Sequence, residues 1–181
     1  PGLPIWKGFH PIADKLPQAI SKEKARKALS WPKDKKIVLF FGLIRKYKGL
    51  GLLIEAFSKA SLNDSKVILA IVGEAYESSN KYIKLIHKLN LNKRIICDFN
   101  YANIHKACQV FCAADVIAQT YISASQSGVT PLAYHFKTPL LVSNIPVLRT
   151  PILEDKTGIV SDIDSENISE IFQKILFVDT L

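Results

Sequence analysis

The 181-residue chain contains no methionine, only three cysteines and no long apolar run. No run approaches the roughly 18–20 residues that a membrane-spanning helix needs, and no signal peptide opens the sequence. The odd number of cysteines does not make a framework of paired disulfides, which favours a reducing compartment over secretion. Because the chain begins at Pro1 and lacks methionine, we expect it to be a fragment or an excised domain of a longer protein.

The composition is typical of a single globular domain. Hydrophobic residues make up 48% of the chain and charged residues 22%, without repeats or low-complexity segments. A chain of this length can bury one substantial core. Residues 1–20 contain four prolines and little periodicity, so we predict an extended linker there and one folded domain over residues 21–181.

Short apolar runs alternate with helical patterns along that domain. Continuous apolar runs predict strands at 36–42, 66–73, 94–99, 115–119, 139–143 and 158–161. Helical periodicity predicts helices near 21–29, 49–60, 77–89, 103–113, 130–137 and 165–177. Strands separated by helices require right-handed crossovers and a parallel sheet covered on both faces. We therefore predict an α/β fold, a doubly wound, Rossmann-like parallel sheet of about six strands, whose ligand binds at the carboxyl ends of the strands.

A cationic loop follows the first predicted strand. Gly42 ends the apolar run, Arg45, Lys46 and Lys48 follow, and a helical pattern begins after Gly49. A strand, a cationic turn and a helix N-terminus together favour an anion, because free backbone N–H groups and the helix dipole both attract negative charge. Phosphate is the first candidate. The alternative is that these cations are solvated charges on an ordinary connection.

The loop after the fourth predicted strand is neutral. No Asp or Glu occurs between Asp115 and Glu154, and residues 121–130 carry four hydroxyl residues besides Tyr121, one amide and one glycine. Small neutral donors can surround a phosphate without competing charge. Thr130 followed by Pro131 predicts a helix N-cap and the first helical residue. The alternative is a polar surface turn.

Positive charge is concentrated near the start of the domain. Ten Lys or Arg residues lie between Lys22 and Lys48, against only Glu23 and Asp34. This imbalance suits an acidic ligand, a nucleic acid backbone or an anionic membrane surface. Part of it is explained by a solvated face on a helix over 21–29. Nucleic acid binding is less favoured, because the stretch lacks interleaved aromatic residues.

A metal site is the less favoured interpretation of one further cluster. His105, Cys108 and Cys112 recur at i, i+3 and i+7, which places them on one helical face. A metal would need a further ligand, typically in a tight Cys-x2-Cys arrangement. The same face can belong to the core, and we expect no metal.

Four motifs in order resemble those of a known family. They are Phe-Phe-Gly-Leu-Ile-Arg-Lys-Tyr-Lys-Gly, Ile-Val-Gly-Glu-Ala-Tyr-Glu, Ala-Ala-Asp-Val and Gln-Ser-Gly-Val-Thr-Pro, which begin at residues 40, 71, 113 and 126. From about Ser21 to its end the chain resembles the C-terminal domain of bacterial family 4 glycosyltransferases with the GT-B fold, in a Gln-Ser-Gly-Val-Thr subgroup. The stretch around His10 resembles the hinge between the two domains of such enzymes, so residues 1–20 would be the remnant of an interdomain linker.

The resemblance implies an enzyme domain that binds a nucleoside-diphosphate sugar, without a metal or other cofactor. The full enzyme would transfer a hexosyl group, with retention, to a glycan or lipid-linked acceptor held by a missing N-terminal domain. Arg45 and Lys48 would act in catalysis by neutralising the leaving diphosphate. The implied donor-binding residues are Gly42, Gly73, Glu74, Asn100, Tyr101, Ser125, Gln126, Ser127, Gly128, Val129 and Thr130.

The resemblance also implies a setting. Capsule, exopolysaccharide or lipopolysaccharide assembly in the cytoplasm is the common use, with possible peripheral contact at the inner membrane and no nucleic acid. The isolated domain is expected to have little or no transferase activity. The alternative function is a non-catalytic basic module that binds nucleic acid or an anionic membrane surface.

The chain departs from the family pattern at two places. Two family glutamates, eight positions apart, fall near Ala124 and Leu132, where this chain has no acid. Ser125, Gln126 and Ser127 are candidates to take over their hydrogen bonds. A phosphosugar epimerase of the same architecture is also disfavoured, because it would need a catalytic acid in this loop. Residues 144–147 replace a turn that commonly contains two glycines.

Overall fold

The structure is a computed structural model, and it describes residues 15–60, 66–76 and 78–170. Within these ranges six strands form one sheet in the order β3-β2-β1-β4-β5-β6. Every neighbouring pair is parallel. The strands are β1 (Lys36–Phe41), β2 (Val67–Val72), β3 (Ile95–Asp98), β4 (Val116–Gln119), β5 (Leu140–Ser143) and β6 (Gly158–Ser161). The predicted six-stranded parallel sheet is therefore confirmed.

Helices connect the strands. They are α1 (Lys22–Leu29), the short 3-10 helix η1 (Lys46–Lys48), α2 (Leu50–Ala60), α3 (Asn80–Lys88), α4 (Ile104–Ala113), α5 (Val129–His135) and α6 (Pro146–Asp155). The first five predicted helices are confirmed, with ends that differ by a few residues. Residues 165–170 are helical as predicted, and the remainder of the helix predicted over 165–177 lies outside the described residues.

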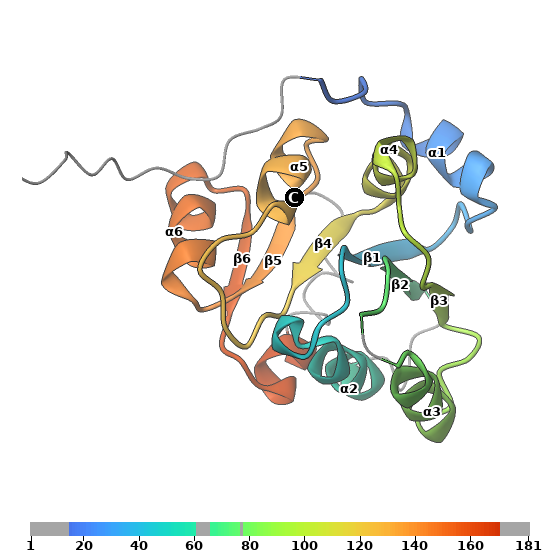
Figure 1. Cartoon of the computed structure of the whole chain (residues 1–181), viewed down its shortest axis with the longest axis vertical. Coiled ribbons are helices and arrows are strands. Elements are labelled where there is room, and N and C mark those ends of the chain that lie inside the picture. Colours follow the sequence, from blue (N-terminus) through green and yellow to red (C-terminus); the bar gives the residue numbers. More distant parts are fainter. Residues whose placement is uncertain (1–14, 61–65, 77, 171–181) are drawn as a thin grey trace, which may run out of the picture.

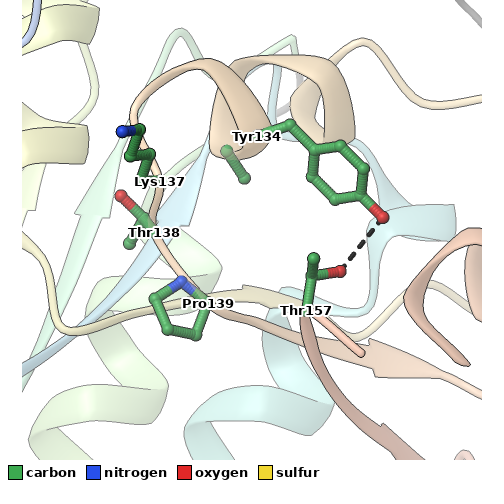
Figure 2. A pocket seen from close by; sticks show the side chains of 6 residues that line it. Tyr134, Lys137, Thr138, Pro139 and Thr157 are labelled. Carbon is green, nitrogen blue, oxygen red and sulfur yellow. Dashed lines mark hydrogen bonds between the residues drawn. The ribbon is translucent and has the colours of Figure 1, made fainter. Parts of the chain in front are cut away.

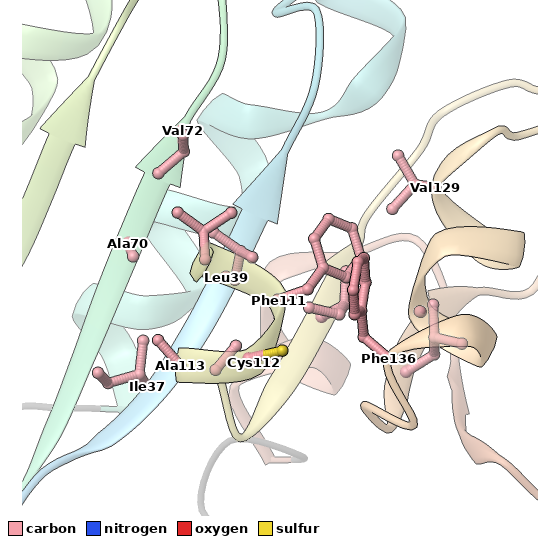
Figure 3. Packing of buried hydrophobic residues seen from close by; sticks show 14 of the residues in the cluster. Ile37, Leu39, Ala70, Val72, Phe111, Cys112, Ala113, Val129 and Phe136 are labelled. Carbon is pink, nitrogen blue, oxygen red and sulfur yellow. The ribbon is translucent and has the colours of Figure 1, made fainter. Parts of the chain in front are cut away.

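Both faces of the sheet are covered, which explains why the strands are apolar throughout. α4 and α5 lie on one side of the sheet, and α2 and α3 lie on the other (Figure 1). Alternate residues of β1 serve the two layers, since Leu39 packs in the core on the α4 side and Phe40 in the core on the α2 side. On the α4 side the ring of Phe111 lies 4.9 Å from that of Phe41. It also packs against the ring of Phe136 at 5.6 Å (Figure 3).

One helix, α6, was not predicted. Pro146 occupies the first turn, where a missing N–H costs nothing, but Pro151 lies inside the helix and removes an internal hydrogen bond. Burial of Leu148, Pro151 and Ile152 against the sheet stabilises the helix despite this loss. Pro146 and Pro151 argue against a helix in the sequence, which is why α6 was not predicted although its apolar residues have ordinary helical spacing.

The order of the strands changes direction between β1 and β4. From β1 the chain moves through β2 to β3, then returns to place β4 on the other side of β1 and continues to β5 and β6. The connection after β1 leads to β2 on one side of this junction, and the connection after β4 leads to β5 on the other side. Parallel α/β sheets bind their ligands where the strand order reverses in this way. The loops after β1 and β4 consequently begin next to each other.

A buried ion pair fixes the amino end of this junction. Arg26, which is 5% exposed, donates from Nη2 to Oδ2 of Asp115 at 2.7 Å. The same carboxylate oxygen accepts from the backbone N–H of Ile37 in β1 at 2.6 Å. Lys22 donates to the other oxygen at 2.7 Å. Part of the basic charge on α1 therefore serves the fold, and the interpretation of this face as merely solvated is wrong for Arg26.

Removal of this carboxylate should destabilise the domain strongly. In an Asp115→Ala variant Arg26 keeps its charge but loses its partner, which typically costs about 3–5 kcal/mol for a buried pair. Urea unfolding monitored by circular dichroism measures the change. The control is Glu23→Ala, which breaks the exposed pair with Lys33 and should change the unfolding free energy very little. Equal unfolding midpoints for the two variants would contradict the structural role of Asp115.

Candidate functional site

The loops 42–49 and 120–128 meet at the junction of β1 and β4. A Cβ atom added to Gly42 would lie 3.1 Å from Nζ of Lys48 and 3.8 Å from Cγ2 of Val129. The two loops thus approach one point just beyond the end of β1. The predicted catalytic residue Lys48 is thus brought together with the predicted donor-binding residues Gly42 and Val129.

Lys48 is the most unusual charged group of this site. Its residue is only 8% exposed, and its Nζ lies 5.4 Å from the centre of the Tyr121 ring. Burial, assisted by the charge of Arg45, lowers the pKa of Lys48 to about 8. No carboxylate within the described residues forms an ion pair with this ammonium. A buried charge without a counter-ion is unfavourable, and a bound anion would relieve that cost.

Arg45 lies in the same loop but faces solvent. Its guanidinium carbon is 4.8 Å from the centre of the Tyr76 ring. Two backbone hydrogen bonds join the loops after β1 and β2. Ile44 N donates to the carbonyl of Glu74 at 2.8 Å, and Tyr76 N donates to the carbonyl of Ile44 at 3.3 Å. Arg45 and the exposed Glu74 therefore border the site from the β2 side.

Two glycines allow these loops to pack backbone against backbone. Gly73 has φ +145°, and a Cβ on it would lie 2.1 Å from the carbonyl oxygen of Gly42. Gly49 has φ +69°, and its Cβ would lie 1.9 Å from the carbonyl oxygen of Thr120. A side chain at either position would force the loops apart. Both glycines therefore set the distance between the loops.

A buried amide organises the neutral loop. Gln119, the last residue of β4, is fully buried. Its Nε2 donates to Oγ of Ser127 at 2.8 Å, and its Oε1 accepts from Oγ1 of Thr130 at 3.1 Å. Sequence reasoning missed Gln119, although a polar residue at the end of an otherwise apolar strand was a visible signal.

The predicted start of α5 was wrong. Gly128 is the N-cap and Val129 the first helical residue, so Thr130 and Pro131 both lie inside the first turn. The reason is that the Thr130 hydroxyl is bound to Gln119, while Oγ of Ser127 accepts from Val129 N at 3.2 Å. Gly128 has φ −72° and open space where a Cβ would lie. A side chain at Gly128 would therefore not restrict the backbone.

Two other predicted residues lie at the edge of the sheet, away from the junction of β1 and β4. Asn100 and Tyr101 follow β3, the edge strand, and Tyr101 is 74% exposed. Three strand spacings place the end of β3 about 14 Å from that of β4. The Asn100 side chain donates to Asp98 at 2.9 Å. Ser125 and Gln126 are exposed on the loop that also carries Ser127.

Two hollows lie outside the junction itself. One, of about 380 Å³, borders the cationic loop and is lined by Lys46, Gly49, Gly51, Leu52, Lys81, Tyr82, Leu85 and Ile122. The other, of about 320 Å³, is at the opposite, amino ends of β5 and β6. Figure 2 shows Tyr134 and Thr157 across it, joined by a hydrogen bond of 3.0 Å. Only the first hollow adjoins the candidate site.

The metal and membrane expectations concern other parts of the fold. Cys108 and Cys112 are buried in α4, whereas His105 is exposed. Within the described residues no group of three His, Cys, Asp or Glu side chains is arranged to hold a metal ion. In the same part of the chain no helix is long and apolar enough to cross a bilayer.

Comparisons with known proteins agree with this architecture. Residues 21–178 match the family model "Glycosyl transferases group 1", and no curated protein matches the chain. The fold is similar to the C-terminal domain of the group 1 glycosyltransferase LpcC from Francisella tularensis, with a TM-score of 0.75 at 20% identity over 88% of this chain and 84% of that one.

Two longer proteins share the fold. WaaG, a glycosyltransferase involved in lipopolysaccharide biosynthesis, gives a TM-score of 0.78 at 21% identity over 94% of this chain and 46% of its own. HepE from Anabaena, in complex with UDP and glucose, gives a TM-score of 0.73 at 20% identity over 86% of this chain and 42% of its own. The chain therefore spans less than half the length of these two proteins.

The charge of Lys48 should disappear at a lower pH than that of any ordinary lysine. Its pKa of about 8 lies below the value of about 10.4 for a solvated lysine, so the ammonium is charged at neutral pH and neutral above about pH 9. We expect the ¹³Cε NMR signal of Lys48, assigned with Lys48→Arg, to titrate near pH 8. Sulfate should raise this midpoint, because an anion stabilises the charged form.

The same shift predicts a dependence of stability on pH. Because the unfolded chain binds the proton more tightly, the unfolding free energy of the native chain relative to Lys48→Met should rise between pH 8 and about 10.4. Below pH 8 the difference should be constant. A Lys48 midpoint near 10, or a difference that does not change with pH, would contradict the burial of a charged Lys48.

Proposed function

The chain belongs to the group 1 glycosyltransferases, and from this we propose that it binds the diphosphate of a nucleoside-diphosphate sugar where β1 meets β4. The observation that supports this most directly is the buried ammonium of Lys48, which has no carboxylate partner within the described residues and lies beside Gly42 and Val129. A diphosphate provides the missing negative charge. It also accepts charge-assisted hydrogen bonds, which are the strongest kind available to it.

Arg45 and Lys48 take part in the reaction through charge. When the bond between the sugar and the diphosphate breaks, negative charge grows on the leaving phosphate oxygen. Lys48 stabilises that charge from a fixed, mostly water-free position, and Arg45 adds a second positive charge from the solvent side. Fixed cations of this kind lower a barrier because they need no reorganisation as the charge develops. They also supply charge that a metal ion would otherwise provide.

The other donor-binding residues follow from the position of the diphosphate. Gly42, Ser127, Gly128 and Val129 surround the phosphates, whereas the hydroxyl of Thr130 is held by Gln119. Ser125 and Gln126, on the same loop, offer a hydroxyl and an amide to the sugar. Gly73 and Glu74 lie on the β2 side, where the carboxylate of Glu74 can accept from ribose hydroxyls. Asn100 and Tyr101, at the sheet edge, would contact the far end of the nucleotide.

The complete reaction needs a second domain. We propose that a hexosyl group is transferred, with retention, to a glycan or lipid-linked acceptor held by an N-terminal domain joined through residues 1–20. The similarity to WaaG, which is involved in lipopolysaccharide biosynthesis, and to HepE, which was solved with UDP and glucose, supports a role in bacterial polysaccharide assembly. Such a role places the enzyme in the cytoplasm, in contact with the inner membrane surface.

The alternative of a non-catalytic basic module has less support. Its cationic stretch contains Arg26 and Lys22, which bind Asp115 within the fold, and Lys48, which is buried. Two of the ten cations, Arg26 and Lys48, are therefore buried, and the exposed Lys22 is paired with Asp115.

Nucleotide binding should depend on the two proposed cations. We expect UDP or GDP to stabilise the chain in a thermal-shift panel, by about 2.7 kcal/mol at a hundredfold excess over the dissociation constant. Each charge-assisted bond to phosphate is worth about 1.5–3 kcal/mol, so a chain with Arg45→Ala and Lys48→Ala should bind at least about a hundredfold more weakly by calorimetry. Unchanged affinity would refute the assignment.

The matched control removes two cations elsewhere. Lys24→Ala combined with Lys27→Ala makes the same change of charge on the exposed face of α1, and nucleotide affinity should be nearly unchanged. If this control loses binding to polyanions or anionic vesicles while the site variant does not, the basic-module function is favoured instead.

A side chain at Gly128 should block the ligand without disturbing the fold. The backbone there has φ −72°, and a Cβ would meet no protein atom within 4 Å. We expect Gly128→Val to abolish nucleotide binding while the melting temperature stays within a few degrees of the native value, whereas Cys108→Ala should bind normally. A Gly128→Val chain that binds nucleotide normally would show that this loop is only a surface turn.

A further inference from the structure

Gln119 binds both hydroxyl residues that flank the start of α5. The amide nitrogen lies 2.8 Å from Oγ of Ser127, and the amide oxygen lies 3.1 Å from Oγ1 of Thr130. The side chain is completely buried, so water does not compete for these bonds. The two ends of one amide have opposite character, since the nitrogen only donates and the oxygen only accepts.

This difference decides what each hydroxyl can do for a ligand. The single proton of the Thr130 hydroxyl is donated to Gln119 Oε1, so it is not available to a phosphate at the same time. Oγ of Ser127 accepts from Gln119 Nε2 and also from Val129 N at 3.2 Å. These two bonds occupy both of its lone pairs. The Ser127 hydroxyl must therefore act as a donor with its own proton.

The Ser127 hydroxyl lies on the side of the loop that faces Lys48. With both lone pairs occupied, Ser127 Oγ donates to the Tyr121 hydroxyl in a long hydrogen bond of 3.4 Å. Lys48 Nζ lies 5.4 Å from the centre of the same ring. Val129 is two residues after Ser127. Its side chain and Lys48 Nζ both lie close to the position that a Cβ atom of Gly42 would occupy. A donor proton and a buried ammonium consequently border the same space.

We propose that Gln119 is a positioning residue, which takes up the Thr130 proton and keeps Ser127 a donor, so that an oxygen of the diphosphate replaces the long 3.4 Å bond from Ser127 to the Tyr121 hydroxyl. This rests on the proposed function. It separates two hydroxyls that the sequence presents as equivalent: Ser127 donates to the ligand, and Thr130 serves only to orient the amide. Gln119 itself does not touch the ligand.

The test compares single and combined variants by calorimetric titration with UDP and with GDP. Ser127→Ala removes the donor and should weaken binding about ten- to a hundredfold. Thr130→Val, the matched control, removes a hydroxyl of the same network at nearly constant volume and should change affinity by less than about threefold. Gln119→Met, close to glutamine in shape, should weaken binding several-fold in the native background.

The decisive measurement is the combination of Gln119→Met with Ser127→Ala. If Gln119 acts on the ligand only through Ser127, the double variant should bind no more weakly than Ser127→Ala alone, which a double-mutant cycle detects directly. A residue that merely supports the fold would weaken binding by the same factor in both backgrounds. Thermal unfolding of each variant records stability separately from affinity.

The outcomes distinguish this inference from the proposed function. Additive losses in the cycle, or a loss for Thr130→Val as large as that for Ser127→Ala, would overturn the role of Gln119 while nucleotide binding stands. If Gln119→Met does not fold, the comparison of Ser127→Ala with Thr130→Val alone decides which hydroxyl donates. Failure of the native chain to bind either nucleotide would refute the proposed function, and this inference with it.

Discussion

The pairing of β1 with β4 is the contact on which the candidate site depends. Only two residue pairs are in register between these strands, against six between β1 and β2. Side chains reinforce the short pairing at both ends. Asp115 binds Arg26 and the Ile37 N–H at the amino end, and Oγ1 of Thr120 donates to the carbonyl of Gly49 at 3.3 Å at the carboxyl end. The relative position of the cationic and neutral loops follows from these bonds.

The two ends of this junction treat positive charge in opposite ways. At the amino end the guanidinium of Arg26 is neutralised within the protein and contributes to stability. At the carboxyl end the ammonium of Lys48 is buried with no carboxylate partner among the described residues, so the fold bears its desolvation cost. Residues 116–153 contain no Asp or Glu, so the neutral loop and α5 offer Lys48 no carboxylate partner. In the proposed function, stability and ligand binding thereby belong to separate ends of the same pair of strands.

The sequence was sufficient for the strands and for the family, because both depend on local patterns. Burial on two faces makes each strand continuously apolar, and four short motifs in order identified the glycosyltransferase family. Contacts between distant residues were not predictable in this way. Arg26 looks solvated among its neighbours, and its partner Asp115 is 89 positions away. Gln119 and Thr130 were likewise missed as a pair, since nothing in the spacing of the neutral loop shows which hydroxyl a buried amide will bind.

Gly49 and Gly73 give the site a particular rigidity. At both positions a Cβ would overlap a carbonyl oxygen of the neighbouring loop, so the width between the main chains of the loops after β1, β2 and β4 is fixed by the radii of backbone atoms. No change of side-chain rotamer can alter that width. The spacing that the proposed ligand would meet therefore exists before it arrives, and the loops would lose little conformational entropy on binding. The entropic cost of association then falls mainly on the ligand, so flexible nucleotides should lose more entropy here than compact anions do.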